Sequence, residues 1–86
     1  MSSYNGYKNW ETWNVMLWAQ NDEPVYRWVE DFLRASPSPV TRMAVRAFFL
    51  GHIFPNGTPD MEKGGRGDMN KVDWYQITHH LNEWND

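Results

Sequence analysis

Apolar positions follow a helical period most clearly between residues 24 and 35. They recur there at intervals of three and four, at Val25, Trp28, Val29, Phe32 and Leu33. This spacing is typical of the buried face of an amphipathic α-helix. Asp22 precedes the segment as an N-cap, and Pro24 fits the first turn, where its missing N–H has no intrahelical partner. We expect this helix to end near Ala35.

An earlier apolar segment predicts a helix from Trp10 to about Gln20, with Asn9 as its N-cap. On a helical wheel, one stripe is shared by Trp10, Trp13 and Leu17. Other apolar side chains fall outside this stripe, at Val15, Met16 and Trp18. A helix that is apolar almost all round is either central in its fold or half-covered by a partner.

Two further segments complete the helical pattern. Ser38 as a cap and Pro39 at the first helical position predict a third helix over residues 39–50. Its expected inner face consists of Val40, Met43, Ala44, Ala47 and Phe48. Asp73 and Gln76 form a capping-box-like pair at the start of the last helix. The expected apolar face of the last helix consists of Trp74, Ile77, Leu81 and Trp84.

The remaining segments are predicted to be irregular. Residues 1–8 are polar and predict an N-terminal arm, and residues 52–72 are rich in Gly, Pro, Asp and Asn and predict a long loop. The Asn56-Gly57 turn signal makes a short β-hairpin in this loop the alternative. Because 86 residues leave no room for a second core, we expect a single all-α domain over residues 1–86. Its architecture is a small bundle of about four helices.

Composition narrows the class of protein. The chain has no Cys, which excludes disulfides and thiolate zinc sites, and it has six Trp, four Tyr and four Phe, which favour a heavy aromatic core. The formal net charge of −3 disfavours sequence-independent binding of nucleic acid. No stretch has the length and hydropathy of a membrane span, and the first residues lack the pattern of a signal peptide. These features predict a cytoplasmic protein without a membrane partner.

The run Asn-Trp-Glu-Thr-Trp-Asn-Val-Met-Leu-Trp at residues 9–18 resembles a signature of small uncharacterised proteins of bacteriophages and bacteria. In that family the run is of the type Asn-Tyr-Glu-Thr-Trp-Asn-Val-Ala-Leu-Trp, so Trp10 and Met16 depart from it. The matching positions are Asn9, Glu11, Thr12, Trp13, Asn14, Val15, Leu17 and Trp18, continuing through Asn21, Asp22 and Glu23. The segment Val72-Asp73-Trp74 with Ile77 also looks like the family's last helix. The resemblance implies a phage-type accessory protein and brings no established activity.

The candidate contact residues lie in and just after the first helix: Glu11, Thr12, Asn14, Trp18, Asn21 and Asp22. One interpretation is structural. A half-buried Asn14 must satisfy its amide, so Asn14 and Thr12 would attach the arm and the long loop to the bundle. The other is functional, with these residues recognising a partner in a groove beside Trp18.

No pattern predicts catalysis. The chain lacks Cys, its serines lie at the N-terminus and in a linker, and no motif pairs a His with an acid. His79 and Glu83 are four residues apart, but two ligands do not make a metal site. The loop acids Asp60, Glu62 and Asp68 do not match a calcium-binding loop. We therefore expect no enzyme activity, no metal and no cofactor.

Three binding hypotheses remain. The preferred one is an accessory protein that binds and modulates a host protein through Trp-rich surface, because Trp, Tyr and Arg dominate binding energy at interfaces. The second is nucleic-acid binding through Arg42 and Arg46, which share one face of the third helix. The third is a homodimer, which would also enlarge the small core.

Overall fold

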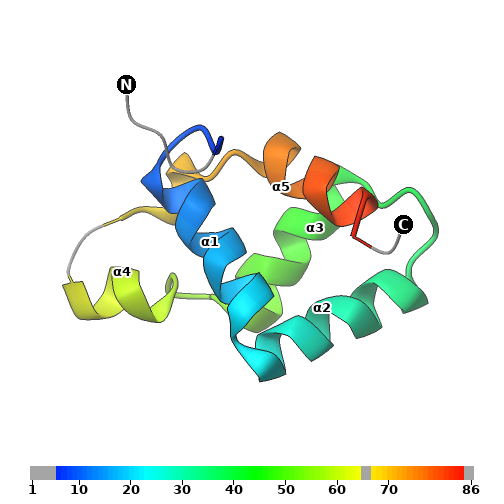
Figure 1. Ribbon diagram of the computed structural model, residues 1–86, viewed down its shortest axis with the longest axis horizontal. Coiled ribbons are helices and arrows are strands. Elements are labelled where there is room, and N and C mark those ends of the chain that lie inside the picture. The colour runs from blue at the N-terminus through cyan, green and yellow to red at the C-terminus, as the bar shows by residue number, and fades with distance from the viewer. Residues whose placement is uncertain (1–5, 65–66, 85–86) are drawn as a thin grey trace.

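The first two helices begin at the residues that the capping pattern predicts. In this computed structural model, which describes residues 6–64 and 67–84, α1 spans Trp10–Asn21 and α2 spans Glu23–Ala35. The side chain of Asn9 accepts a hydrogen bond from the backbone N–H of Thr12 at 2.9 Å. Asp22 does the same for Val25 at 3.3 Å. Figure 1 shows the two helices joined by a sharp turn, with α1 crossing the middle of the molecule.

The buried face of α1 differs from the predicted stripe. Val15, Met16 and Ala19 are fully buried, and they lie beside two buried polar residues, Thr12 and Asn14. The predicted stripe residues are only half-buried: Trp10, Trp13 and Leu17. The wheel treats polar residues as outward-facing, whereas Thr12 and Asn14 are buried because tertiary hydrogen bonds satisfy their side chains.

The third helix begins later than predicted. α3 spans Arg42–Phe48, and its N-cap is Thr41, whose hydroxyl accepts from the Ala44 N–H at 3.1 Å. The prediction of Ser38 as cap and Pro39 as first helical residue is wrong. The backbone of Val40 is engaged elsewhere, since its N–H donates to Asn82 Oδ1 at 2.9 Å and its C=O accepts from Asn82 Nδ2 at 3.2 Å.

The predicted inner face of the third helix is also wrong in part. Met43 is 77% exposed, and Ala44 and Ala47 are exposed as well. Val45 and Phe49 are fully buried instead. Burying these two larger side chains removes more apolar surface from water than burying two alanines. The helix continues as a π-helical turn, η1, over Phe49–Ile53.

Much of the predicted long loop is helical. It contains α4, Pro59–Gly64, and a 3-10 turn, η2, Met69–Lys71. The Asn56-Gly57 signal forms no hairpin among the described residues, where pairing is limited to an isolated bridge between Pro55 and Gly57. Gly67 has a φ of +92°, and a Cβ placed there would lie 2.7 Å from the Trp10 ring, so the turn requires glycine.

The last helix, α5, spans Trp74–Asn82, and Asp73 caps it by accepting from the N–H groups of Tyr75 and Gln76. The reciprocal half of the predicted capping box is wrong. The Gln76 side chain instead accepts from the Lys8 N–H and donates to the Gly6 carbonyl, both at 2.9 Å. It thereby holds the end of the predicted arm against α5; residues 1–5 of that arm lie outside the described residues.

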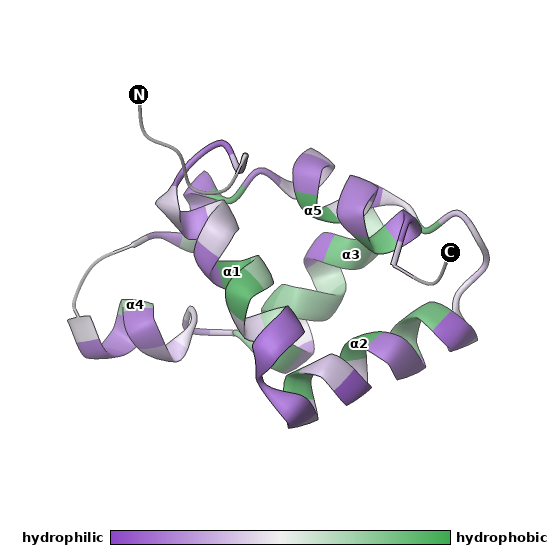
Figure 2. Cartoon of the chain, in the orientation of Figure 1, coloured by the Kyte–Doolittle hydropathy of each residue, from purple (hydrophilic) through white to green (hydrophobic). Residues whose placement is uncertain are grey.

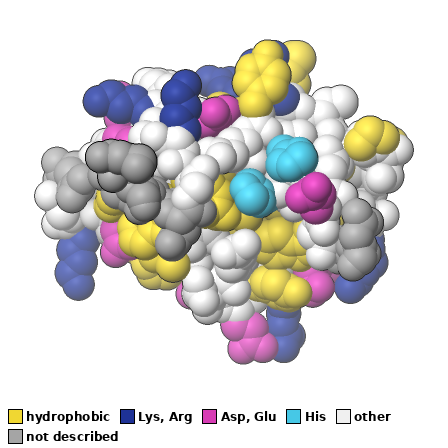
Figure 3. Space-filling model, turned by 45° about the horizontal axis from the view of Figure 1, so that its top comes forward, with side chains coloured by type: hydrophobic (Ala, Val, Ile, Leu, Met, Phe, Trp, Pro, Cys, Tyr) yellow, Lys and Arg dark blue, Asp and Glu magenta, His cyan; other side chains and the backbone are white. Residues whose placement is uncertain are grey.

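The core collects apolar side chains from every α-helix, and the all-α class is confirmed. Figure 2 shows hydrophobic ribbon concentrated on α3 and the inner sides of α1, α2 and α5. Within residues 6–64 and 67–84, no helix combines the length and hydropathy needed to cross a membrane. Figure 3 shows a surface of mixed chemistry on the α5 side, with basic side chains near the top of the view beside exposed hydrophobic ones.

Candidate functional site

Two buried polar side chains of α1 attach the C-terminal half of the chain to this helix. Thr12 Oγ1 donates to Asn9 Oδ1 at 2.6 Å and accepts from the Asp73 N–H at 2.8 Å. Asn14 is 1% exposed; its Oδ1 accepts from the Thr58 hydroxyl, and its Nδ2 donates to Asp60 Oδ2 at 2.9 Å. Asn14 makes the predicted contact with the long loop, whereas Thr12 contacts Asn9 and Asp73, which lie just outside the predicted arm and loop.

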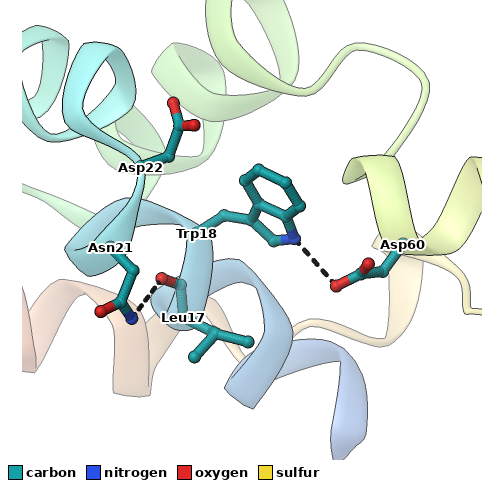
Figure 4. A pocket seen from close by; sticks show the side chains of 5 residues that line it. All are labelled: Leu17, Trp18, Asn21, Asp22 and Asp60. Carbon is teal, nitrogen blue, oxygen red and sulfur yellow. Dashed lines mark hydrogen bonds between the residues drawn. The ribbon is translucent and has the colours of Figure 1, made fainter.

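The same carboxylate oxygen of Asp60 receives a second hydrogen bond, from the indole N–H of Trp18 at 2.9 Å. Beside this bond is an open pocket of about 310 Å³, which we call the Trp18 pocket. It is lined by Leu17, Trp18, Asn21, Asp22 and Asp60 (Figure 4). Leu17, Trp18 and Asn21 come from the end of α1, Asp22 is the cap of α2, and Asp60 comes from α4.

The pocket is electronegative. The hydrogen bonds from Asn14 and Trp18 lower the pKa of the Asp60 carboxyl, and Lys63 lowers it further, so the group is ionised at neutral pH. Asp22 adds a second carboxylate, although one of its oxygens is engaged as the cap of α2. The Asn21 amide donates to the Leu17 carbonyl at 2.9 Å, which leaves its Oδ1 as an acceptor.

This chemistry suits a cationic side chain with an apolar stem. Carboxylates accept charge-assisted hydrogen bonds from Lys or Arg. An indole face attracts the same cations, and Leu17 offers an apolar contact for the methylene groups. The lining has no Ser, Cys, His or Lys, and its titratable groups are the carboxylates of Asp22 and Asp60.

The structure separates the six predicted contact residues into three groups. Trp18, Asn21 and Asp22 line the pocket. Thr12 and Asn14 are buried in α1 and anchor other segments. Glu11 is half-buried in the first turn of α1 and is not among the residues that line the pocket.

Sequence reasoning missed Leu17 and Asp60 as pocket residues. Asp60 appears in the sequence only as one of several acids in the 52–72 segment. The signal that points to it is indirect: a half-buried Asn14 requires a polar partner, and the predicted source was the arm or the long loop. Nothing in the spacing distinguishes Asp60 from Glu62 in this role.

The other candidate binding residues lie elsewhere on the surface. Arg42 and Arg46 are exposed on α3, and the guanidinium carbon of Arg42 lies 4.1 Å from the centroid of the Tyr75 ring. His79 Nε2 lies 3.6 Å from Glu83 Oε2 on the surface of α5. The described part of the chain contains no group of three side chains that could hold a metal ion.

Comparison with known proteins places the chain in a family. The model of a family of unknown function, DUF7249, matches residues 1–43. No curated protein and no solved structure matches the chain. The match covers α1 and α2, and with them Trp18, Asn21 and Asp22, whereas Asp60 lies beyond it. The prediction of an uncharacterised family is confirmed, and since the match spans half of the sequence, the chain belongs to the DUF7249 family of unknown function.

Proposed function

We propose that this protein is a non-enzymatic accessory protein that binds and modulates another protein through the Trp18 pocket. The observation that carries the proposal is the convergence of three predicted contact residues, Trp18, Asn21 and Asp22, on one open pocket with an ionised Asp60. A cavity with a few convergent polar groups is the usual form of a site that takes a small ligand, and one inserted side chain is a ligand of that size.

The chemistry of the pocket defines the partner's anchor. The two carboxylates and the indole face favour a Lys or Arg side chain inserted from the partner. The Trp18 indole is already fixed by its bond to Asp60, so little side-chain freedom is lost when a partner binds.

A stable protein interface needs about 800 Å² on each partner, more than one pocket supplies. The surface extends from Asp22 to Trp28, which is 50% exposed on the next turns of α2. Trp28 lines a mainly apolar groove of about 440 Å³ with Phe32, Phe48 and Ile53, and Asp31 and His52 complete its lining. A half-exposed Trp beside such a groove is typical of a residue that contributes strongly to binding energy.

The resemblance of residues 9–18 to a bacteriophage and bacterial signature supports a finer form of the proposal. In that form the protein is phage-encoded, acts in the host cytoplasm, and binds a host protein. A homodimer formed through the same surface is the alternative partner, and it predicts a different mass in solution.

The test compares two variants with the same charge change on α1. Asn21→Arg places a cation and a long side chain at the Trp18 pocket, whereas Gln20→Arg changes an exposed neighbour outside it. Tagged protein is used as bait in nuclease-treated bacterial lysate, and bound proteins are identified by mass spectrometry. We expect one dominant protein that the wild type and Gln20→Arg capture and Asn21→Arg does not.

Other results contradict the proposal. If both variants capture the same proteins as the wild type, the pocket is not the contact. If the wild type captures none, and light scattering shows a dimer that Asn21→Arg dissociates, the surface serves self-association. Circular dichroism of each variant shows that a loss of capture does not reflect unfolding.

A further inference from the structure

A second hollow lies where the N-terminal ends of α3 and α5 meet residues 8–9 and the end of η2. Its volume is about 440 Å³, and its lining includes Lys8, Arg42, Lys71, Asp73 and Tyr75. We call it the basic cradle. It shares no lining residue with the Trp18 pocket. The cradle was not visible in the sequence, because its cations come from three separate segments.

The cradle contains three cations. No ion pair joins Lys8, Arg42 or Lys71 to another residue that the structure describes. The arginines of α2 behave differently, since Arg27 lies 2.7 Å from Glu23 and Arg34 lies 3.6 Å from Asp31. In a chain with eleven acidic and eight basic residues, a hollow lined by three cations and one carboxylate is a local reversal of charge.

The acidic residue of the cradle is already engaged. Asp73 Oδ1 accepts from the backbone N–H groups of Tyr75 at 3.1 Å and Gln76 at 3.2 Å. Its charge therefore interacts with the positive N-terminal end of α5. The lining therefore holds three cations, Lys8, Arg42 and Lys71, against this one carboxylate, and its formal net charge is positive.

The cradle also presents an aromatic ring to solvent. Tyr75 is 67% exposed, so it contributes little to the core. The Arg42 guanidinium lies over one face of the ring, 4.1 Å from its centroid, so a base would stack on the opposite face. Exposed aromatic rings beside cations are the feature on which unpaired bases stack.

We propose that the basic cradle binds single-stranded nucleic acid, with one base stacked on Tyr75 and the flanking phosphates on Lys8, Arg42 and Lys71. Arg46, one turn along α3 from Arg42, extends the basic surface. A single strand fits better than a duplex, because α3 has seven residues and no side-chain pattern of a helix that reads a groove. An acidic peptide would satisfy the cations but would leave Tyr75 without a base to stack on.

The experiment measures fluorescence anisotropy of a labelled oligothymidine of about 10 nucleotides, which is within the range of single-strand sites. At about 50 mM salt we expect saturable binding, with log K falling against log salt at a slope of about −2 for three phosphate contacts. Tyr75→Ala is expected to weaken binding about tenfold, whereas Tyr75→Phe, which keeps the ring, retains it. Lys71→Glu is expected to weaken binding and to make the slope shallower.

The matched control is Arg34→Glu, which makes the same kind of charge reversal on α2 outside the cradle. Equal losses for Lys71→Glu and Arg34→Glu would show non-specific attraction and overturn the proposal. The same holds if Tyr75→Ala binds as the wild type does, if a duplex of equal length binds as tightly, or if polyglutamate competes as well as the oligonucleotide. Absence of binding to the wild type also overturns it.

Discussion

Asp60 both holds α4 against α1 and lines the candidate site. One carboxylate oxygen accepts from the buried Asn14 amide and from the Trp18 indole, while the residue itself remains exposed at the pocket. The two donors lie one helical turn apart on α1, so a single acceptor can serve both. The same charge can therefore fix α4 against α1 and attract a cationic partner.

Replacing Asp60 with Ala is expected to destabilise the protein by about 1–3 kcal/mol, because the buried Asn14 Nδ2 loses its acceptor. Glu62→Ala removes an exposed acid from the same helix and should have a much smaller effect. The measurement is urea denaturation of the three proteins at neutral pH. Equal destabilisation by the two substitutions would show that the charge of α4, and not the hydrogen bonds, is what matters.

The pH dependence of this difference follows from the lowered pKa of Asp60. A carboxyl whose pKa is lower in the folded than in the unfolded chain stabilises the fold above its unfolded pKa, here 3.8. That stabilisation is lost as the pH falls through the folded pKa. The gap in stability between wild type and Asp60→Ala should therefore be constant near neutral pH and narrow in the acid range below 3.8.

The sequence predicted part of the candidate site, and there is a physical reason why it did not predict the rest. Trp18, Asn21 and Asp22 were accessible to sequence reasoning because they lie within one helix and its turn, where spacing fixes geometry. Asp60 is 42 residues from Trp18, and its placement depends on tertiary packing that periodicity does not encode. The requirement of Asn14 for a partner predicted the contact but not the partner's identity.

At the scale of elements, helix starts were predictable where a cap and the following turn are local. Asn9, Asp22 and Asp73 cap the helices they were expected to cap. The predicted start of the third helix is wrong because the Asn82 side chain forms hydrogen bonds with the backbone of Val40. That long-range interaction favours an extended chain where local sequence favours a helix start, and it shifts the cap to Thr41.

α4 depends on side-chain hydrogen bonds for its attachment. The Thr58 hydroxyl donates to Asn14 Oδ1 and accepts from the Met61 N–H at 3.2 Å, so it both caps α4 and attaches it to α1. Thr58→Val keeps the shape of this fully buried side chain but removes both bonds. We expect amide hydrogen exchange over residues 59–64 to accelerate about tenfold or more, from a loss of at least about 1.4 kcal/mol.

Thr58→Ser retains the hydroxyl and is the control for this experiment, which is read by mass spectrometry at peptide resolution. Exchange in α1 should change less than exchange in α4, because α1 also packs against α2 and α5. A uniform acceleration across the whole chain would show that α4 is not a separate opening unit and that Thr58 acts on global stability.

At the scale of the whole molecule, one aromatic cluster joins elements that are distant in the sequence. Phe49 is fully buried, and its ring lies 5.9 Å from that of Trp74 and 6.1 Å from that of Phe54. It connects the end of α3 to α5 and to the segment before α4. The two proposed sites share no lining residue, so substitutions at one should leave the other intact.

Phe49→Ala tests how far the fold depends on this cluster. Removing a buried Phe costs about 3–5 kcal/mol, and small domains have a total stability of about 5–15 kcal/mol. For a chain of 86 residues we expect a loss of most of that stability, seen as a large fall in the midpoint of urea denaturation. Tryptophan fluorescence and far-ultraviolet circular dichroism should report the same transition, because the core is shared by every α-helix.

Met43→Ala is the control, because Met43 lies on the exposed face of α3 that sequence periodicity placed inside. This variant should change the free energy of unfolding by no more than about 0.5 kcal/mol. Comparable losses for the two variants would mean that α3 packs in the register predicted from the sequence and not in the one described above.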